Sequence, residues 1–430
     1  MRITPLSYPL GVHRGRWVVA GLLFLVTVIN YVDRQVFSIL APDLQDEIGW
    51  SELDYGRIII AFQVSYALMT LGAGRLLDRI GTRLGFALAV AAWSVVAMGH
   101  ALARSPAGFG AARFLLGMTE AANFPAAVKT VAERFPAGER AMATGIFNSG
   151  VAAGTIVASI AVPLITAAWG WRAAFVATGA VGLMWLPLWW WVYKDGGGVP
   201  ATTTSLVPWR ALLGFKQTWT YTLAKCLADP IWWFYLFWLP KFLAAEHGVR
   251  GTAVIPYLTT VYIAADIGCL IGGYLSSALV RRGWTLNAAR KGTFVVLMLL
   301  TTPLVITAGF IRDPWTAIAL IALACGCHQA WSTMVYTLAS DLFPSEAVGS
   351  VTGIGGLMAG VVSTLTAELT GRMLNANPSY YLPIFIAAGC LYPIGLAVIH
   401  GLSPRMVPVS PGQLHGRTLA VTPAPLTEVV

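Results

Sequence analysis

Charged residues are scarce in this chain of 430 residues, because Asp, Glu, Lys and Arg together make up 11% of it. An average soluble domain contains about 25% of these residues. Hydrophobic residues reach 57% here, more than the roughly 45–50% of such a domain. The composition therefore excludes an ordinary soluble domain and predicts a membrane protein.

Cysteine is also rare, and no disulfide framework or metal site is expected. The five cysteines lie in apolar stretches, where a thiol is a small buried side chain: Cys226, Cys269, Cys325, Cys327 and Cys390. Although Cys325-Gly-Cys327-His328 resembles a metal site, thiols two positions apart on a helix point to different faces. We therefore expect no metal.

Catalytic patterns are missing as well. The sequence has no clustered His or Asp with metal-ligand spacing, no Ser or Cys nucleophile motif and no Gly-rich phosphate loop. A membrane-embedded enzyme is therefore disfavoured, as is a pump driven by ATP, and no cofactor is expected.

The apolar residues form twelve blocks, each long enough to cross a hydrocarbon core of about 30 Å as a helix. This predicts an all-α membrane protein with twelve transmembrane helices. The first block is too long for a signal peptide and lacks a cleavage pattern of small residues, so we expect it to be retained. The blocks lie near residues 17–41, 55–76, 84–104, 108–131, 140–167, 171–193, 217–243, 253–279, 292–311, 314–339, 346–371 and 379–401.

The net charge of +9 is explained by basic residues that gather on one side of the predicted membrane spans. When the twelve spans are threaded with both termini on one side, 18 of the 28 Lys and Arg lie on that side and 7 on the other. Cytoplasmic loops are enriched in Lys and Arg, so both termini are expected in the cytoplasm. Nucleic acid is therefore not expected as a partner. Three bases remain, and they lie inside the predicted spans away from the span ends: Arg34, Arg113 and Lys225.

The chain divides into two related halves. A polar segment, 194–216, separates an amino-terminal six-helix bundle at 1–193 from a carboxy-terminal six-helix bundle at 217–401, and a cytoplasmic tail follows at 402–430. "FPAGERAMATG" from Phe135 is echoed by "FPSEAVGSVTG" from Phe343, 208 residues later. Related bundles that face each other predict a central substrate cavity near the midplane.

A loop between spans two and three carries a family signature. "GRLLDRIGTR", from Gly74 to Arg83, resembles the cytoplasmic loop motif of the major facilitator superfamily. The motif residues Gly74, Asp78, Arg79 and Arg83 are expected to act as a conformational latch, in which Asp78 caps a neighbouring helix end and pairs with Arg. In the second half Ser277 and Ala278 stand where Asp and Arg would be, so a matching charge latch is not expected there.

A narrower resemblance covers nearly the whole chain. "NYVDRQVFSILAPDLQ", "RFLLGMTEAANFPAAVKTVAERFPAGERAMATGIFNSG", "CLADPIWWFYLFWLPKFL" and "HQAWSTMVYTLASDLFP" resemble the anion:cation symporter family, and within it most of all the bacterial hexuronate transporters. The resemblance implies proton-coupled uptake of a sugar-acid anion across the bacterial inner membrane. It further implies that Arg34 binds the substrate carboxylate and that Asp33 and Glu120 couple protons.

Placing a charged side chain inside the membrane costs a few kcal/mol of free energy. A residue that is kept there is therefore a candidate for a functional role. By helical rise, Arg34 and Arg113 lie at a similar depth, about 10 Å below the outer edge of the membrane. Glu120 is two turns deeper than Arg113 on the same helix face. Two guanidiniums at one level favour a carboxylate site. The alternative is a set of structural ion pairs bracing the bundle.

Proton coupling follows from the same cluster, because a carboxylate paired with Arg competes with an anionic substrate for that Arg. We hypothesise that Asp33 and Glu120 protonate from outside, free the arginines for the anion, and deprotonate after the cavity opens to the cytoplasm. Which acid is the main carrier stays open, since Asp33 could instead hold Arg34 in place.

The second half supplies further candidates. Lys225 and Asp229 are spaced four residues apart, as a structural ion pair or a substrate contact would be; Asp266 and His328 lie at mid-depth. Neutral partners for hydroxyl groups and aromatic surfaces for a sugar complete the predicted substrate site: Asn30, Tyr31, Tyr66, Asn148, Trp232 and Gln329. We expect a monomer. Aldonates, aldarates, anion exchange and sodium coupling stay open as alternatives, while a channel fits the Gly-rich bundles poorly.

Overall fold

The computed structural model describes residues 10–50, 52–194, 207–249, 255–377 and 381–414, and this part of the chain is helical throughout, with no strand. Apart from one short 3-10 turn, η1 (His100–Leu102), the elements are α-helices. They are α1 (Leu10–Ile48), α2 (Glu52–Ile80), α3 (Thr82–Gly99), α4 (Pro106–Glu120), α5 (Asn123–Arg134), α6 (Ala137–Trp169), α7 (Trp171–Val192), α8 (Trp209–Leu213), α9 (Lys216–His247), α10 (Ile255–Arg281), α11 (Leu286–Ala308), α12 (Pro314–Leu342), α13 (Ser345–Ala376) and α14 (Tyr381–Leu402).

Ten of these helices are long and apolar enough to cross a membrane by themselves: α1, α2, α3, α6, α7, α10, α11, α12, α13 and α14. The other two spans differ for visible reasons. One is interrupted, as α4 followed by α5, and the other is α9, which carries Lys225 and Asp229 within its length. The prediction of an all-α membrane protein with twelve spans is therefore confirmed.

The break in the fourth span was not predicted, but its cause is in the sequence. α4 ends at Glu120 and α5 begins at Asn123. Pro125 lies in the first turn of α5. Because proline has no N–H, it cannot bond to the carbonyl of Ala121 and disfavours a helix that continues through this point. The interruption lies beside Glu120.

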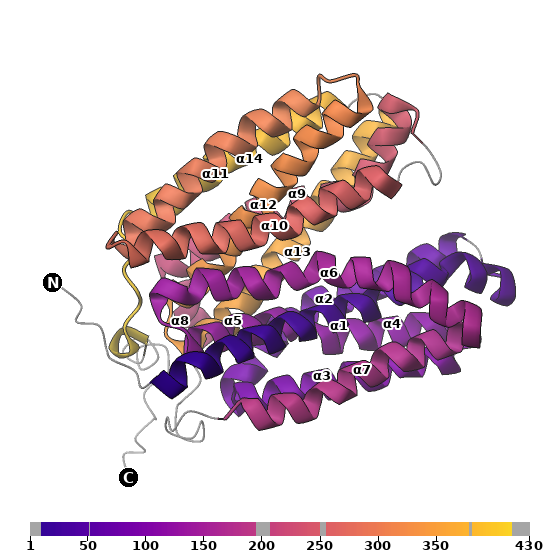
Figure 1. Cartoon of the computed structure of the whole chain (residues 1–430), viewed down its shortest axis with the longest axis horizontal. Coiled ribbons are helices and arrows are strands. Elements are labelled where there is room, and N and C mark those ends of the chain that lie inside the picture. Colours follow the sequence, from indigo (N-terminus) through magenta and orange to yellow (C-terminus); the bar gives the residue numbers. More distant parts are fainter. Residues whose placement is uncertain (1–9, 51, 195–206, 250–254, 378–380, 415–430) are drawn as a thin grey trace, which may run out of the picture.

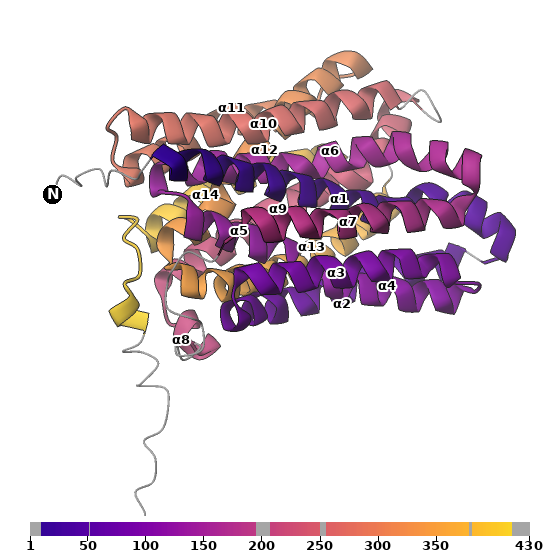
Figure 2. The same ribbon diagram turned by 60° about the horizontal axis from the view of Figure 1, so that its bottom comes forward.

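The spans form two bundles with the same packing plan (Figures 1 and 2). In the first bundle α1 packs on α6, α2 on α4, and α3 on α7. In the second bundle the corresponding pairs are α9 with α13, α10 with α12, and α11 with α14. The matched pairs extend the repeat seen between Phe135 and Phe343 to the whole of each half.

The bundles lie closest at the end of the molecule where α1 begins and α14 ends, which we call the terminal end, and diverge toward the other end (Figure 1). Here α2 packs on α13, and α6 on α10. Glycine permits both contacts: a Cβ at Gly74 would lie 2.0 Å from the Gly349 carbonyl oxygen, and one at Gly273 would lie 2.5 Å from that of Ala141. Both contacts are thus made by bare backbone.

Polar contacts at the terminal end follow the same two-fold plan. Asp78 accepts a hydrogen bond from the Ser350 amide at 2.7 Å, and Ser277 accepts one from the Met142 amide at 3.2 Å. Residues 142 and 350 are again 208 positions apart. Asp78 thus contacts the sixth residue of α13, and Ser277 occupies the corresponding place in the second half without a charge. The role of Asp78 as a latch stays a prediction.

The ion pairs at this end differ from those expected. Asp78 pairs with Lys129 at 2.6 Å rather than with an arginine of its own loop. Arg79 is exposed, and Arg83 donates to the Trp190 carbonyl at 2.8 Å. In the second half a charge cluster does exist, because Asp341 pairs with Arg290 at 2.7 Å and with Arg140 of the first bundle at 3.5 Å.

The connection and the tail both pack on the terminal end. Much of the predicted linker lies outside the described residues, but its last part forms α8. Arg75 of α2 donates to the Val207 carbonyl at 3.2 Å, which ties this segment to the first bundle. Tail residues pack on the second bundle: the Val409 amide donates to the Leu342 carbonyl at 2.8 Å. Residues 415–430 of the predicted tail lie outside the described part.

Candidate functional site

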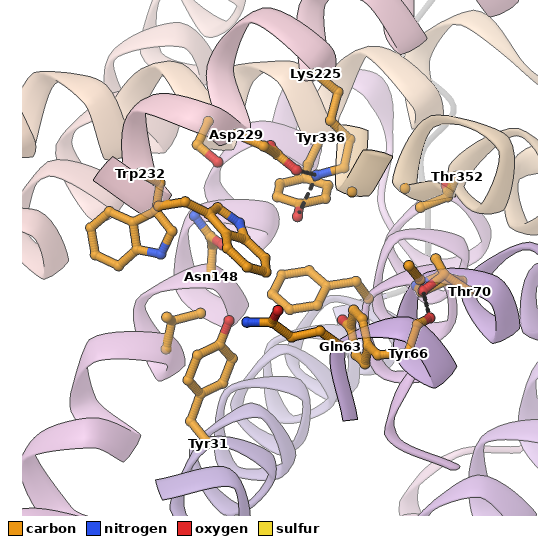
Figure 3. Close-up of a pocket in the computed structure, with 18 of the residues that line it drawn as sticks. Tyr31, Gln63, Tyr66, Thr70, Asn148, Lys225, Asp229, Trp232, Tyr336 and Thr352 are labelled. Carbon is orange, nitrogen blue, oxygen red and sulfur yellow. Dashed lines mark hydrogen bonds and ion pairs between the residues drawn. The ribbon is translucent and has the colours of Figure 1, made fainter. Parts of the chain in front are cut away.

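A cavity of about 150 Å³ lies between the bundles and is lined by both of them. A buried water needs roughly 10–15 Å³ of such space, so the cavity has room for a small organic molecule. Figure 3 shows Tyr31, Gln63 and Tyr66 on one side of the cavity and Lys225, Asp229 and Tyr336 on the other. Of the described residues that line the cavity, three carry a full charge: Arg34, Lys225 and Asp229.

Arg34 of α1 is the charged group on the first wall. Its Nε and Nη2 donate to Glu120 Oε2 at 3.2 and 3.1 Å, so one carboxylate oxygen receives both bonds. The Arg34 side chain is 21% exposed, whereas that of Glu120 is fully buried. The arginine therefore stands between the carboxylate and the cavity, and Glu120 Oε1 has no hydrogen-bond partner among the described residues.

Aromatic rings surround the Arg34 guanidinium. Its Cζ atom lies 4.7 Å from the ring centroid of Tyr31, 4.8 Å from that of Tyr66 and 5.1 Å from that of Phe62. Rings at this distance attract a cation through their π faces and restrict its movement. Asn30 contributes a further acceptor, its Oδ1 being 3.4 Å from Arg34 Nη2. Asn30 is buried and is not part of the cavity wall.

Arg113 forms a second layer behind Arg34 instead of lining the cavity. Its side chain is buried, its Nη2 donates to the backbone carbonyl of Arg34 at 3.0 Å, and its Cζ lies 4.5 Å from the Phe37 ring centroid. The two guanidiniums are therefore neighbours, as their predicted depths indicated. In this conformation, however, only Arg34 is presented to a molecule in the cavity.

Asp33 is adjacent to Arg34 in sequence but is separate from it in space. Consecutive residues on a helix do not face each other, and the Asp33 carboxylate, 2% exposed, is directed away from the cavity toward Thr178 of α7. Thr178 donates to the Phe175 carbonyl, and neither Asp33 oxygen makes a hydrogen bond of normal geometry within the described residues. In the described part of the chain, Asp33 therefore makes no hydrogen bond to Arg34.

The second wall carries a pair with Lys225 at its centre. Lys225 Nζ donates to Asp229 Oδ2 at 2.6 Å and to the Tyr336 hydroxyl at 2.9 Å. Both residues of the ion pair are on α9, one turn apart, so that α9 presents them on one face. Tyr336 comes from α12 and stacks on Phe124 of the first bundle, with ring centroids 5.2 Å apart.

Of the other residues predicted in the second half, His328, Gln329 and Trp232 reach the cavity, whereas Asp266 does not. His328 lines it, but its Nδ1 is hydrogen bonded to the Tyr392 hydroxyl at 2.8 Å, and its ring lies parallel to that of Trp232. Gln329 and Trp232 also belong to the wall. Asp266 does not, although one of its oxygens is buried without a partner among the described residues.

Asn148 links the two bundles at the cavity. Its Nδ2 donates to Cys269 Sγ at 3.3 Å and to Thr333 Oγ1 at 3.4 Å, both in the second half. It also belongs to the cavity wall. A bound molecule that bonds to this amide would therefore act on a contact between the bundles.

The main site residue that the sequence did not reveal is Tyr336, the partner of Lys225. Phe62 and Phe124 were missed as well, although both line the cavity. An aromatic residue in an apolar helix resembles any packing residue, so only its position relative to the charged residues could have revealed it. Among the described residues, no group of three or more His, Cys, Asp and Glu could hold a metal ion.

Comparison with known proteins adds to the geometry. The family model of the Major Facilitator Superfamily matches residues 23–367. The chain is 31% identical over 406 residues to the "Hexuronate transporter" of Escherichia coli (strain K12), covering 89% of this chain and 93% of that protein. It is 32% identical over 332 residues to the "Galacturonate transporter" of Dickeya chrysanthemi, covering 72% of this chain and 95% of that one.

A solved structure confirms the fold. The proton:xylose symporter XylE, bound to 6-bromo-6-deoxy-D-glucose, superposes with a TM-score of 0.75 at 12% identity, covering 94% of this chain and 99% of that one. An identity this low supports the arrangement of helices alone.

Proposed function

The chain belongs to the Major Facilitator Superfamily, whose members are membrane transporters and not enzymes, and we propose that it carries a sugar-acid anion, such as galacturonate or glucuronate, together with protons. The transport step is alternating access, in which the two bundles rock about a central cavity. The names of the relatives support a sugar acid as the substrate.

The observation that carries the proposal is Arg34, a guanidinium that faces the cavity while its carboxylate partner is buried behind it. Guanidinium groups bind carboxylates through two parallel hydrogen bonds. Arg34 already donates two hydrogen bonds to Glu120, although both converge on one oxygen. A substrate carboxylate can therefore replace Glu120 as its partner, provided that Glu120 gives up its negative charge.

Proton coupling follows from this exchange. Protonation of Glu120 removes the charge that competes for Arg34, so a proton and an anionic substrate favour each other's binding. Loss of the proton restores the Arg34–Glu120 pair and expels the anion. Asp33 is buried close to the same cluster, and we propose it as a second proton site that acts without touching the substrate.

The orientation is also a proposal. The terminal end carries most of the basic residues, so we place it in the cytoplasm of a bacterial inner membrane. The bundles are joined at that end by Gly74, Gly273 and the contacts of Asp78 and Asp341. The conformation described here is therefore one that faces outward.

The test is uptake by proteoliposomes that contain the purified protein. Radiolabelled galacturonate, glucuronate, galactonate and glucarate are each supplied with and without an inward proton gradient. We expect uptake of at least one sugar acid, and accumulation only when the gradient is present. Uptake that ignores the gradient would overturn proton coupling, and no uptake of any organic anion would overturn the proposal as a whole.

A further inference from the structure

The two ion pairs at the cavity present opposite charges to it. On the first wall the base, Arg34, is 21% exposed and its acid, Glu120, is fully buried. On the second wall the order is reversed: the side chain of Asp229 is 23% exposed and that of Lys225 only 6%. A molecule in the cavity therefore meets the cation of Arg34 on one wall and the carboxylate of Asp229 on the other. Figure 3 shows Asp229 beside Lys225 on the second wall.

Lys225 also lines the cavity, but both hydrogen-bond partners of its ammonium group are protein side chains. Its ammonium group is fixed by Asp229 at 2.6 Å and by the Tyr336 hydroxyl at 2.9 Å. Tyr336 is itself held by stacking on Phe124 of the other bundle. Asp229, in contrast, offers its exposed edge, and it is the one acidic residue among the described residues that line the cavity.

We propose that Asp229 is a specificity-determining residue that excludes sugar acids with a carboxylate at each end, so that the substrate is a monocarboxylate. The inference rests on the proposed function, because it takes Arg34 as the site of the substrate carboxylate. It narrows the substrate class to uronates and aldonates and excludes aldarates.

The exclusion of aldarates follows from the chemical group at the end of the sugar acid opposite to the carboxylate that Arg34 binds. With one carboxylate on Arg34, the other end of the molecule faces the second wall of the same cavity. A hydroxyl there donates a hydrogen bond to Asp229 and satisfies it. A second carboxylate instead meets the like charge of Asp229, an arrangement that specific binding sites use to reject wrong partners.

A matched pair of ligands isolates this effect. Galactonate and galactarate are both open chains and differ only at one end, which is an alcohol in the first and a carboxylate in the second. Each competes, unlabelled, with radiolabelled galacturonate for the protein in proteoliposomes. The quantity measured is the ratio of the two inhibitory concentrations, because a loss of folded protein alters both concentrations together.

For the unchanged protein we expect galactarate to compete at least about tenfold more weakly than galactonate. In Asp229→Asn the acid becomes a neutral amide of the same shape, and the ratio should fall by about tenfold. Asp229→Glu, which keeps the charge, should retain the exclusion. Glu368→Gln removes an equal charge from a side chain that is 65% exposed on α13 and should leave the ratio unchanged.

A second variant guards against poor folding of Asp229→Asn, in which Lys225 has lost its partner. Lys225→Met with Asp229→Asn removes both charges, and the ratio should again fall. The inference is overturned if galactarate competes as well as galactonate in the unchanged protein, or if neither variant alters the ratio. If no sugar acid competes at all in the unchanged protein, the proposed function fails instead, so the two failures are distinguishable.

Discussion

The pairs Arg34–Glu120 and Lys225–Asp229 have the same chemistry but differ in which partner reaches the cavity. In the first bundle the carboxylate is sealed behind the base, so its charge can affect a substrate only by releasing or retaining Arg34. In the second bundle the carboxylate is the more exposed partner, so a molecule in the cavity would contact it directly. Burial order, and not residue type, therefore distinguishes the two roles we propose, in which Glu120 controls the release of Arg34 and Asp229 repels a second carboxylate.

The largest effect is expected from removing the exposed base of the first pair. Arg34→Ala deletes the proposed carboxylate site and leaves Glu120 buried without its partner, a change that costs about 2–5 kcal/mol for a buried charge pair. Uptake and binding should fall by about a hundredfold or more, measured by labelled uptake and by equilibrium binding. Arg34→Lys keeps the charge but lacks the paired donors of a guanidinium. Its uptake should therefore lie between that of the unchanged protein and that of Arg34→Ala. Full activity in Arg34→Ala would contradict the proposed site.

The next effect separates coupling from binding in the same pair. Glu120→Gln keeps an oxygen for Arg34 but has no proton to exchange, so accumulation driven by a proton gradient should disappear. Counterflow exchange, which needs no net proton movement, should persist. The two assays run on the same proteoliposomes, with exchange as the internal control. Unimpaired accumulation in this variant would refute Glu120 as the coupling acid.

A smaller effect is expected from the buried base of the second pair. Lys225→Met leaves Asp229 with no cation, and uptake should drop by about tenfold because an unpaired acid then faces an anionic substrate. Lys225→Met with Asp229→Asn should recover part of this loss, since the remaining wall is neutral. Thermal unfolding of both variants reports their folding. A double variant no better than the single one would show that Lys225 itself contacts the substrate.

The smallest effect is expected from an ion pair that faces away from the cavity. Glu368 and Arg372 are 65% and 78% exposed and one turn apart, at a distance of 2.8 Å. Exposed pairs contribute about 0–1 kcal/mol. Glu368→Gln should therefore leave uptake and its dependence on the proton gradient unchanged. A clear loss would mean that charge outside the two cavity pairs also controls transport.

Much of the fold was predictable because hydrophobic length and repetition are local properties of the sequence. The twelve blocks and the 208-residue repeat were enough to predict twelve spans in two bundles. The interruption after Glu120 was missed because the block from 108 to 131 has the length of one continuous span, and Pro125 alone marks the break. α9 was found from its apolar residues despite the charges of Lys225 and Asp229.

The sequence indicated several residues of the candidate site, but it did not indicate which of them contact each other. Arg34, Lys225 and Glu120 stood out because a charge inside a span is rare. Their partners depend on which faces of separate helices meet, which the sequence does not state: Arg34 pairs with Glu120, not with its neighbour Asp33. Lys129 and Arg290 are two of the 18 bases that the threading places on the side of the termini, and both are buried in ion pairs, with Asp78 and Asp341 respectively.

The glycine contacts between the bundles lower the free-energy cost of closing and separating the two bundles repeatedly. Where Gly74 meets Gly349 and Gly273 meets Ala141, the surfaces that touch are backbone, which the helices already hold rigid. Fixing a long side chain would cost up to about 2 kcal/mol of rotational entropy at each closure. An interface made of backbone atoms avoids this entropic cost, because no side chain has to be fixed. Joined and parted states can therefore lie close in free energy, as repeated cycling requires.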